Sequence, residues 1–216
     1  MSQIGVGGQR DKMTKVACRP RATQTPIMTP LTLRPLTPDD FPVVERLFGP
    51  NGAASGCWCM FFHLPTGKEW QATRGEAARQ AFAAKVAGGE IHATLAFRGD
   101  EPVGFCRIGP RQDFDRLARS RVLSPPADPE TWSVVCFFIH RTARRQGVAH
   151  ALLEAASVQA FAAGAPAIEA YPVVPPKSGK LGSSFAYTGV PALYEAAGFR
   201  KVPNPAGVRP IYRLAP

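Results

Sequence analysis

The sequence predicts a mixed α/β fold, and three observations lead to that prediction. Residues 92–98 and 102–107 are apolar-rich segments separated by a Gly-Asp-Glu turn, which is typical of a β-hairpin. Residues 132–140 form a continuous apolar run, as expected of a central strand buried on both faces. The segment 147–163 that follows carries apolar residues at helical spacing. An antiparallel first half and a strand-to-helix unit in the second half make the fold mixed.

The remaining elements follow in chain order. Residues 31–34 alternate apolar and polar side chains, like a short strand. The tetrapeptide Thr-Pro-Asp-Asp at 37–40 has the residues of a helix start, so we expect a helix from there to about Phe48. A second helix is expected from Lys68 to Ala87, where two glycines follow. Towards the C-terminus we expect a strand, a short helix and two more strands, at 167–174, 191–197, 199–202 and 208–213.

Composition and charge limit the function classes. The 216 residues are 45% hydrophobic and 19% charged, which excludes a wholly disordered chain. The formal net charge of +10 suggests an anionic partner, whether nucleic acid, membrane or phosphorylated small molecule. Residues 1–30 hold five cations against one acid without any periodicity, so we expect a basic tail there and one domain over 31–216. Alternatively, Met28 is the true start of the protein.

The sequence offers no signal for export or membrane insertion. The first thirty residues lack the apolar stretch of a secretory signal, and no run approaches the roughly 18 apolar residues that span a bilayer. The cysteines are odd in number and unevenly placed, as expected of reduced thiols: Cys18, Cys57, Cys59, Cys106 and Cys136. We therefore expect a cytoplasmic protein without a membrane partner.

The most informative segment, Ile139-His-Arg-Thr-Ala-Arg-Arg-Gln-Gly-Val-Ala149, joins the apolar strand to the amphipathic helix. A helix start presents unpaired backbone N–H groups and the positive end of the helix dipole, which together bind anions. Gly147 lets a ligand approach the backbone, and Arg144 and Arg145 grip phosphate bidentately. We predict a phosphate or pyrophosphate site, although the segment matches neither a P-loop nor a GxGxxG fingerprint. The alternative is a solvated basic helix cap.

This segment resembles the acyl-CoA motif of the GNAT N-acetyltransferase superfamily, in which Gln/Arg-x-x-Gly-x-Gly/Ala follows the central strand; here it is Arg144-x-x-Gly147-x-Ala149. A second stretch, Leu-Tyr-Glu-Ala-Ala-Gly-Phe at 193–199, resembles the late helix-to-strand element of the same family. The resemblance covers nearly all of the chain after residue 30. It implies a GNAT-like fold, with a mixed central β-sheet of about six to seven strands flanked by helices.

The resemblance also implies an activity and its site residues. The protein would be an acetyl-CoA-dependent N-acetyltransferase whose backbone near Phe138 and Ile139 pairs with the pantetheine arm. The pyrophosphate would lie against the loop and first helical turn, formed by Arg144, Arg145, Gln146, Gly147, Val148 and Ala149. Tyr194 would return a proton to the leaving CoA thiolate, because a phenol with a pKa of about 10 is protonated at neutral pH. Alternatively, Tyr194 only packs under the last strands.

The sequence departs from the family pattern at two places. Many relatives carry a Glu on the central strand that draws a proton from the amine, but residues 132–140 contain none and Glu130 precedes them. Tyr187 stands where an Asn often precedes the late helix. The general base is therefore unassigned, and an amine that arrives neutral needs none.

A cluster of unusual composition, Gly-Cys-Trp-Cys-Met-Phe-Phe-His at 56–63, falls between the first two predicted helices. In a GNAT-like fold it would lie on the acceptor side, so we expect it to form the wall of an acceptor pocket through Cys57, Trp58, Cys59 and Phe61. Zinc binding and a nucleophilic thiol are the alternatives. No metal is expected, because zinc usually needs four ligands with paired spacings. A similar GCWC segment occurs in a poorly characterised GNAT subgroup.

The sequence therefore favours transfer of an acetyl group from acetyl-CoA to a primary amine of a small molecule, with a protein N-terminus or lysine as second choice. Two alternatives come from other classes: an acyl-CoA-binding sensor with a degenerate site, and a basic nucleic-acid-binding protein. Nucleic acid is disfavoured because the sequence has no stacking-aromatic motif and no recognition helix. The oligomeric state, monomer or homodimer, stays open.

Overall fold

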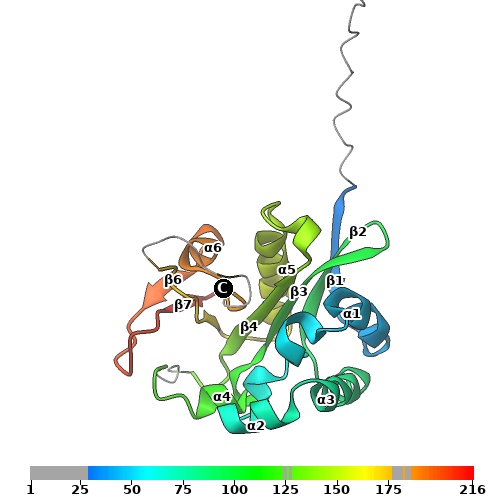
Figure 1. Cartoon of the computed structure of the whole chain (residues 1–216). Helices are drawn as coiled ribbons and strands as arrows, with labels where there is room; N and C mark the ends of the chain where they lie inside the picture. Colours follow the sequence, from blue (N-terminus) through cyan, green and yellow to red (C-terminus); the bar gives the residue numbers. More distant parts are fainter. Residues whose placement is uncertain (1–28, 124–125, 127, 177–181, 183–185) are drawn as a thin grey trace, which may run out of the picture.

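The computed structural model describes residues 29–123, 126, 128–176, 182 and 186–216. The basic tail expected at 1–30 thus lies almost entirely outside the described residues. Within them, seven strands form one mixed sheet in the order β1-β2-β3-β4-β5-β7-β6 (Figure 1). The strands are β1 Leu31–Pro35, β2 Ala93–Arg98, β3 Glu101–Pro110, β4 Trp132–Ile139, β5 Ile168–Ala170, β6 Arg200–Val202 and β7 Ile211–Leu214. The mixed α/β fold is confirmed.

Only the central pair, β4 and β5, is parallel, and every other neighbouring pair is antiparallel. A parallel pair needs a crossover connection, and the longest helix supplies it here. The α-helices of the described residues are α1 Phe41–Phe48, α2 Gly67–Thr73, α3 Glu76–Ala87, α4 Asp115–Ala118, α5 Val148–Ala162 and α6 Pro191–Ala196. In this part of the chain, no helix is both long and apolar enough to cross a membrane.

The helices cover both faces of the sheet. Leu95 and Phe105 are paired across β2 and β3, and they pack against α1 and α3 on one face. Their chain neighbours Ala96 and Cys106 point to the opposite face and pack against α5. This alternation follows from the two-residue period of a strand. It explains why these strands are almost continuously apolar, since both faces of the sheet are buried.

The structure corrects the helix predicted from Lys68 to Ala87, which is two helices, α2 and α3. The break lies at Gly75, whose φ of 91° is left-handed and favours glycine. Its N–H donates to the carbonyl of Gly56 at 2.8 Å, and a Cβ on Gly56 would lie 2.7 Å from the Gly75 nitrogen. The two backbones therefore touch at a pair of glycines, which ties the segment after α1 to the start of α3.

The strand predicted over 167–174 is also shorter than expected. Pairing between β4 and β5 ends at Val134 and Ala170, although β4 continues to Ile139. Beyond that point Val173 donates its N–H to the carbonyl of Gly189 instead of to β4. The two central strands therefore diverge, and the gap between them forms the candidate site.

Candidate active site

The edge of β4 that faces the gap carries backbone groups free of the β3 ladder. His140 donates its N–H to the carbonyl of Val103 on the β3 side. In an antiparallel ladder alternate residues turn the other way, so Phe137 and Ile139 direct their N–H and C=O groups into the gap. The N–H of Phe137 donates to the carbonyl of Tyr187 at 2.6 Å. The Ile139 carbonyl accepts a hydrogen bond from Nε of Arg144 at 3.0 Å, which leaves the Ile139 N–H directed at the gap.

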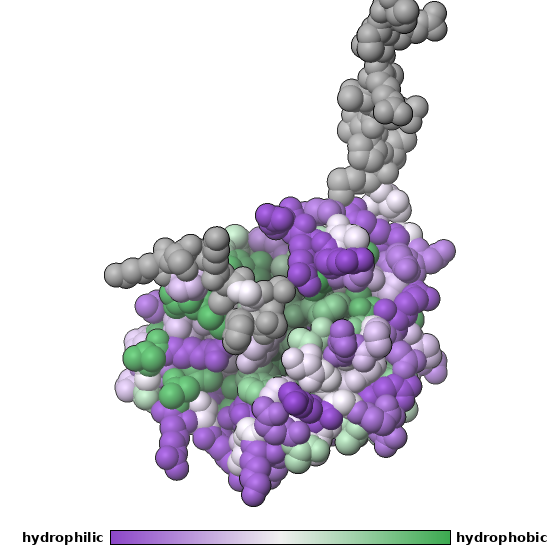
Figure 2. Space-filling model, viewed as in Figure 1, coloured by the Kyte–Doolittle hydropathy of each residue, from purple (hydrophilic) through white to green (hydrophobic). Residues whose placement is uncertain are grey.

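A cavity of about 1030 Å³ lies along this edge. Its walls come from three parts of the chain: the segment between α1 and α2, the second half of β4 with the start of α5, and the segment that leads into α6. Figure 2 shows a hollow near the centre of this face, with apolar and neutral residues in it and hydrophilic residues around its rim. The sequence-predicted residues Cys57, Cys59, Phe61, Phe138, Ile139, Arg144 and Ala149 all line it.

The start of α5 has the geometry of an anion site. Arg145 and Gly147 adopt left-handed φ values of 58° and 78°, so the chain turns sharply before the helix begins. The space where a Cβ of Gly147 would project is open, with no atom within 4 Å. Gln146 accepts a hydrogen bond from Arg98 and donates one to the carbonyl of Thr142, which holds the loop in place.

Four of the eight residues predicted to bind the cofactor reach the cavity, namely Phe138, Ile139, Arg144 and Ala149. Arg145, Gln146 and Gly147 are exposed in the loop next to it. Val148 is 1% exposed and packs in the core beneath α5, so its side chain anchors the helix and only its N–H faces the loop. The arrangement presents unpaired helix-start N–H groups and arginine side chains at one end of the cavity.

The GCWC segment divides its side chains between the cavity and the core. Cys57 and Cys59 line the cavity, but Trp58 does not. Its indole is 4% exposed and lies against the rings of Phe41 and Phe48, at centroid distances of 6.1 and 5.9 Å. The wall role expected for Trp58 is therefore not what this structure shows. Trp58 and Cys59 adopt left-handed φ values of 45° and 59°, a costly conformation for non-glycine residues that is common at functional sites.

Burial and a nearby arginine set the protonation of this cluster. A hydrogen bond to Cys136 and the guanidinium of Arg107 lower the pKa of Cys59, whereas the pKa of Cys136 is raised. Burial, and then the charge of Arg107, lower the pKa of His63 to about 4, so His63 is neutral at pH 7. Among the described residues, no three His, Cys, Asp or Glu side chains gather where they would hold a metal ion.

Tyr194 lies one layer behind the cavity wall. Its side chain is fully buried, its hydroxyl donates to the carbonyl of Thr188 at 2.8 Å, and burial raises its pKa well above 10. Gly189 separates it from the cavity, because a Cβ on this glycine would lie 2.9 Å from the Tyr194 ring. Tyr187 lines the cavity directly. The role of Tyr194 as the proton donor stays a prediction.

The structure adds cavity residues that sequence reasoning did not single out as site residues: Phe48, Trp70 and Tyr187. No short motif joins them, because they come from α1, from α2 and from the segment before α6. One sequence feature could have pointed to them: Trp70 is the single aromatic residue of a mostly polar helix, Gly-Lys-Glu-Trp-Gln-Ala-Thr.

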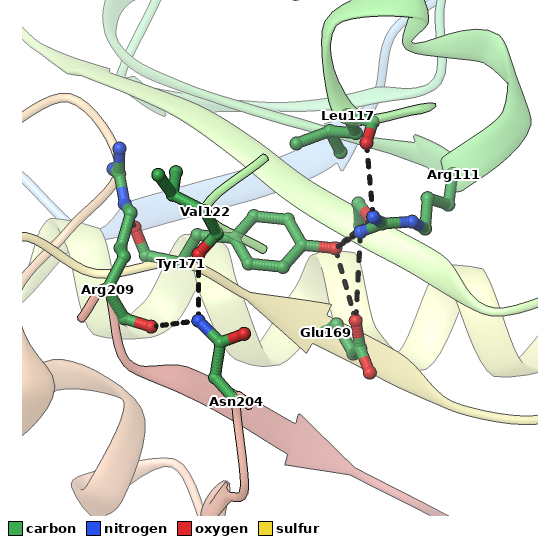
Figure 3. Close-up of polar contacts among 8 residues, drawn as sticks. Arg111, Leu117, Val122, Glu169, Tyr171, Asn204 and Arg209 are labelled. Carbon is green, nitrogen blue, oxygen red and sulfur yellow. Dashed lines mark hydrogen bonds and ion pairs between the residues drawn. The ribbon is translucent and has the colours of Figure 1, made fainter. Parts of the chain in front are cut away.

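A buried polar network supports the start of the gap (Figure 3). Arg111 donates to the hydroxyl of Tyr171 at 2.5 Å, and this hydroxyl donates to Glu169 at 3.2 Å. Ser133 of β4 lies 2.9 Å from the same hydroxyl, and Arg209 donates to the Tyr171 carbonyl from the far side. The network joins β4, β5 and the segment before β7 at the point where the central strands part. It also keeps the carboxylate of Glu169 away from the cavity.

The family is decided by a match over the centre of the chain. The model of the acetyltransferase (GNAT) family matches residues 58–176, which is more than half of the sequence. The chain belongs to the GNAT acetyltransferase family. The matched range begins at Trp58, inside the GCWC segment, and includes β4 and the loop before α5. No curated protein matches the chain significantly.

Solved structures share the fold of this GNAT protein at low sequence identity. An uncharacterized protein from Bacillus halodurans is 14% identical, with a TM-score of 0.51, over 86% of this chain and 83% of its own. An N-acetyltransferase from Staphylococcus aureus Mu50 is 14% identical, with a TM-score of 0.50, over 86% of this chain and 98% of its own. The protein yncA of Salmonella typhimurium, solved with its cofactor acetyl-CoA, is 12% identical, with a TM-score of 0.50, over 86% of this chain and 93% of its own.

Proposed function

We propose that this GNAT protein transfers the acetyl group of acetyl-CoA to a primary amine of a small molecule. The observation that carries the proposal is a single continuous cavity with two unlike ends. One end meets the N-terminus of α5 and Arg144, and the other is enclosed by apolar side chains. The yncA structure of the same fold holds acetyl-CoA, which supports this choice of donor. The unpaired state of Cys57, Cys59, Cys106 and Cys136 agrees with a reducing, cytoplasmic location.

The residues at the α5 end fit a CoA moiety. The N–H groups of the first turn of α5 and the side chain of Arg144 bind the pyrophosphate, and open space before Gly147 admits it. The carbonyl of Ile139, turned into the gap, has a second lone pair beside the one that Arg144 uses and accepts a hydrogen bond from a pantetheine amide, which leaves the Ile139 N–H for the reacting carbonyl. Acetyl-CoA, when bound, supplies the activated thioester.

The chemistry then needs three contributions from the protein. The apolar walls exclude water and hold the amine against the thioester, and positioning of this kind supplies a large part of the rate. The Ile139 N–H stabilises the oxyanion that forms during attack. Because none of the described cavity-lining residues is Asp or Glu, the amine enters already neutral, and no side chain takes its proton before attack.

The proposal is tested by calorimetric titration with acetyl-CoA, followed by thiol release across a panel of amines. We expect saturable acetyl-CoA binding and thiol release that depends on the added amine. Absence of acetyl-CoA binding would overturn the proposal. Binding without turnover on a broad panel would favour an acyl-CoA sensor instead.

We propose that Tyr194 returns the proton to the departing thiolate. This requires its hydroxyl to leave the Thr188 carbonyl and to reach the cavity past Gly189, and two variants test it. We expect Tyr194→Phe to lower kcat by roughly 10²-fold or more, the usual contribution of a general acid, while the acetyl-CoA Kd is unchanged. Tyr187→Phe is the matched control, since it removes a phenol that lines the same cavity. If Tyr187→Phe lowered kcat and Tyr194→Phe left it unchanged, the proton would come from Tyr187. Tyr194 would then only pack under the last strands.

A further inference from the structure

Four aromatic residues from the segment before α2, from α2 itself and from the segment before α6 line the cavity. We call them the aromatic box: Phe61, Phe62, Trp70 and Tyr187. The ring of Phe61 lies at its centre. Its centroid is 5.2 Å from Phe62, 5.7 Å from Trp70 and 6.0 Å from Tyr187, each in an edge-to-face arrangement. Edge-to-face contacts of this kind are the preferred geometry of aromatic pairs, and the parts of these rings that line the cavity offer the same contact to a ring of the acceptor.

The charges around the aromatic box are positive. The guanidinium of Arg116 lies 4.0 Å from the centroid of the Phe61 ring. It is held there, because Nε donates to the Phe61 carbonyl and Nη2 to the Thr66 carbonyl, both at 2.8 Å. One face of the central ring is thus already paired with a cation.

The cavity offers no carboxylate among the lining residues that the structure describes. Glu69, next to Trp70, caps its own helix by accepting from the N–H and hydroxyl of Thr66 at 2.9 Å. Glu169 is 3% exposed and bonded within the Arg111 and Tyr171 network.

This combination selects against cations. An ammonium moved into an apolar site loses its hydration and needs an opposite charge to replace it, and the described cavity lining offers no carboxylate for this. The reacting amine avoids this cost of lost hydration because it binds in its neutral form, which is also a nucleophile that needs no general base. A second ammonium on the same molecule would bind charged and would carry the full cost. Polyamines and amino sugars with several amines are therefore excluded.

We infer that the acceptor is a primary amine attached to an aromatic ring and carrying no second positive charge. The ring occupies the aromatic box and the amine points along β4 towards Ile139. This inference rests on the proposed acetyl transfer and adds to it the chemical class of the acceptor.

The first test compares 2-phenylethylamine with 1,4-diaminobutane and spermidine as acceptors at saturating acetyl-CoA. We expect kcat/KM for 2-phenylethylamine to exceed that for either polyamine by at least about tenfold, the effect of one unpaired charge in such a site. Equal or reversed preference, or no transfer to 2-phenylethylamine, would overturn the inference. Acetyl-CoA titration is run in parallel, because failure to bind acetyl-CoA defeats the proposed function, whereas binding with polyamine preference defeats only the acceptor class.

The second test changes charge without changing shape. Asn51 lines the cavity, and Asn51→Asp places a carboxylate there. Because Asn and Asp have nearly the same shape, the wild-type protein is the control. We expect the ratio of kcat/KM for 1,4-diaminobutane to that for 2-phenylethylamine to rise by about tenfold or more. An unchanged ratio would show that missing negative charge does not set the preference.

The third test removes the central ring. We expect Phe61→Leu to lower kcat/KM for 2-phenylethylamine by on the order of threefold to tenfold and to leave the acetyl-CoA Kd unchanged. Propylamine serves as the ring-free acceptor, and its kcat/KM should stay within about twofold. Equal losses for both amines would mean that the ring of Phe61 does not recognise the acceptor.

Discussion

Arg107 is among the largest fully buried side chains of this protein, and its partners are neutral. Its Nη1 donates to the carbonyls of His92 and Ile108 at 2.6 and 2.9 Å, and its Nη2 lies 3.3 Å from Nε2 of His63. The register of β3 and β4 places Arg107 opposite Cys136. Burial together with this cation keeps His63 neutral, and the hydrogen bond to Cys136 together with the same cation lowers the pKa of Cys59.

Asp40 provides a pH-dependent prediction at the same scale. Arg34 donates two hydrogen bonds to its carboxylate, and the N–H and hydroxyl of Thr37 add two more, so the pKa of Asp40 falls to about 2. A carboxylate with a lowered folded-state pKa stabilises the fold above its unfolded pKa, and this contribution fades as the pH falls towards 2. We expect Asp40→Asn to cost about 2 kcal/mol of unfolding free energy at pH 7, and much less at pH 2.5.

Urea denaturation at pH 7, 4 and 2.5 measures this effect. Asp39→Asn is the control, since it changes the exposed neighbour in the same turn. A cost for Asp40→Asn that stays constant from pH 7 to pH 2.5 would show that the ion pair is not its source.

At the scale of elements, α5 links the core to one end of the cavity, where we propose that the cofactor binds. Its start packs closely on β3, where a Cβ on Gly104 would lie 2.8 Å from Leu152 and 3.0 Å from Val148. The helix therefore approaches the sheet through a glycine, and its first turn is held at the edge of the gap. Because Val148 is clamped between helix and sheet, the N–H groups of this turn keep a constant direction.

Gly147 and Gly164 flank α5 and offer a matched pair of variants. Both have left-handed φ values, 78° and 89°, and neither would place a Cβ within 4 Å of another atom. We expect Gly147→Ala and Gly164→Ala each to lower the unfolding free energy by about 1 kcal/mol, because alanine is strained there. Only Gly147→Ala should also weaken acetyl-CoA binding, on the order of tenfold, since it alters the anion site.

Chemical denaturation and calorimetry measure the two quantities separately. Comparable acetyl-CoA affinities for the two variants would contradict the placement of the pyrophosphate at the start of α5.

At the scale of the whole molecule, the charge separates into two parts. Residues 1–30 hold five cations and one acid, so residues 31–216 retain +6 of the total +10. Arg141, Arg144 and Arg145 cluster in the loop before α5, where the proposed CoA pyrophosphate is held. The charge of the folded part is therefore explained in part by a small anionic ligand, and a nucleic-acid surface is not needed to account for it.

This division predicts that residues 1–27 are dispensable for folding and for the cofactor. The sheet begins at Leu31, and Thr29 accepts a hydrogen bond from Arg98 at 2.7 Å, so a protein starting at Met28 retains both. We expect its Tm to stay within about 2 °C and its acetyl-CoA Kd within about twofold of the full chain. Differential scanning calorimetry and titration check this, and a clear loss of either would make the N-terminal segment part of the domain.

Much of the fold was accessible from local patterns. The strand at 132–139 and the helix that follows it were visible as an apolar run and a helical stripe, since such periodicities need only neighbouring residues. The break between α2 and α3 at Gly75 was not visible in the sequence, because it depends on contact with the distant Gly56. The early end of β5 was not visible either, because it depends on how β4 and β5 diverge. Tyr194 was named from a motif, but its distance from the cavity is set by packing against Phe199 and Tyr212.

By itself the sequence determined the family, the order of the elements and the α5 end of the cavity, because that end is built from one uninterrupted stretch, from β4 into α5. Only the tertiary structure decided the aromatic box. There Phe61, Trp70 and Tyr187 come together from distant parts of the chain, and Trp58 turns into the core while its neighbours face the cavity. Contacts between distant segments leave no periodic trace in a sequence, since burial of side chains is settled by how the elements pack.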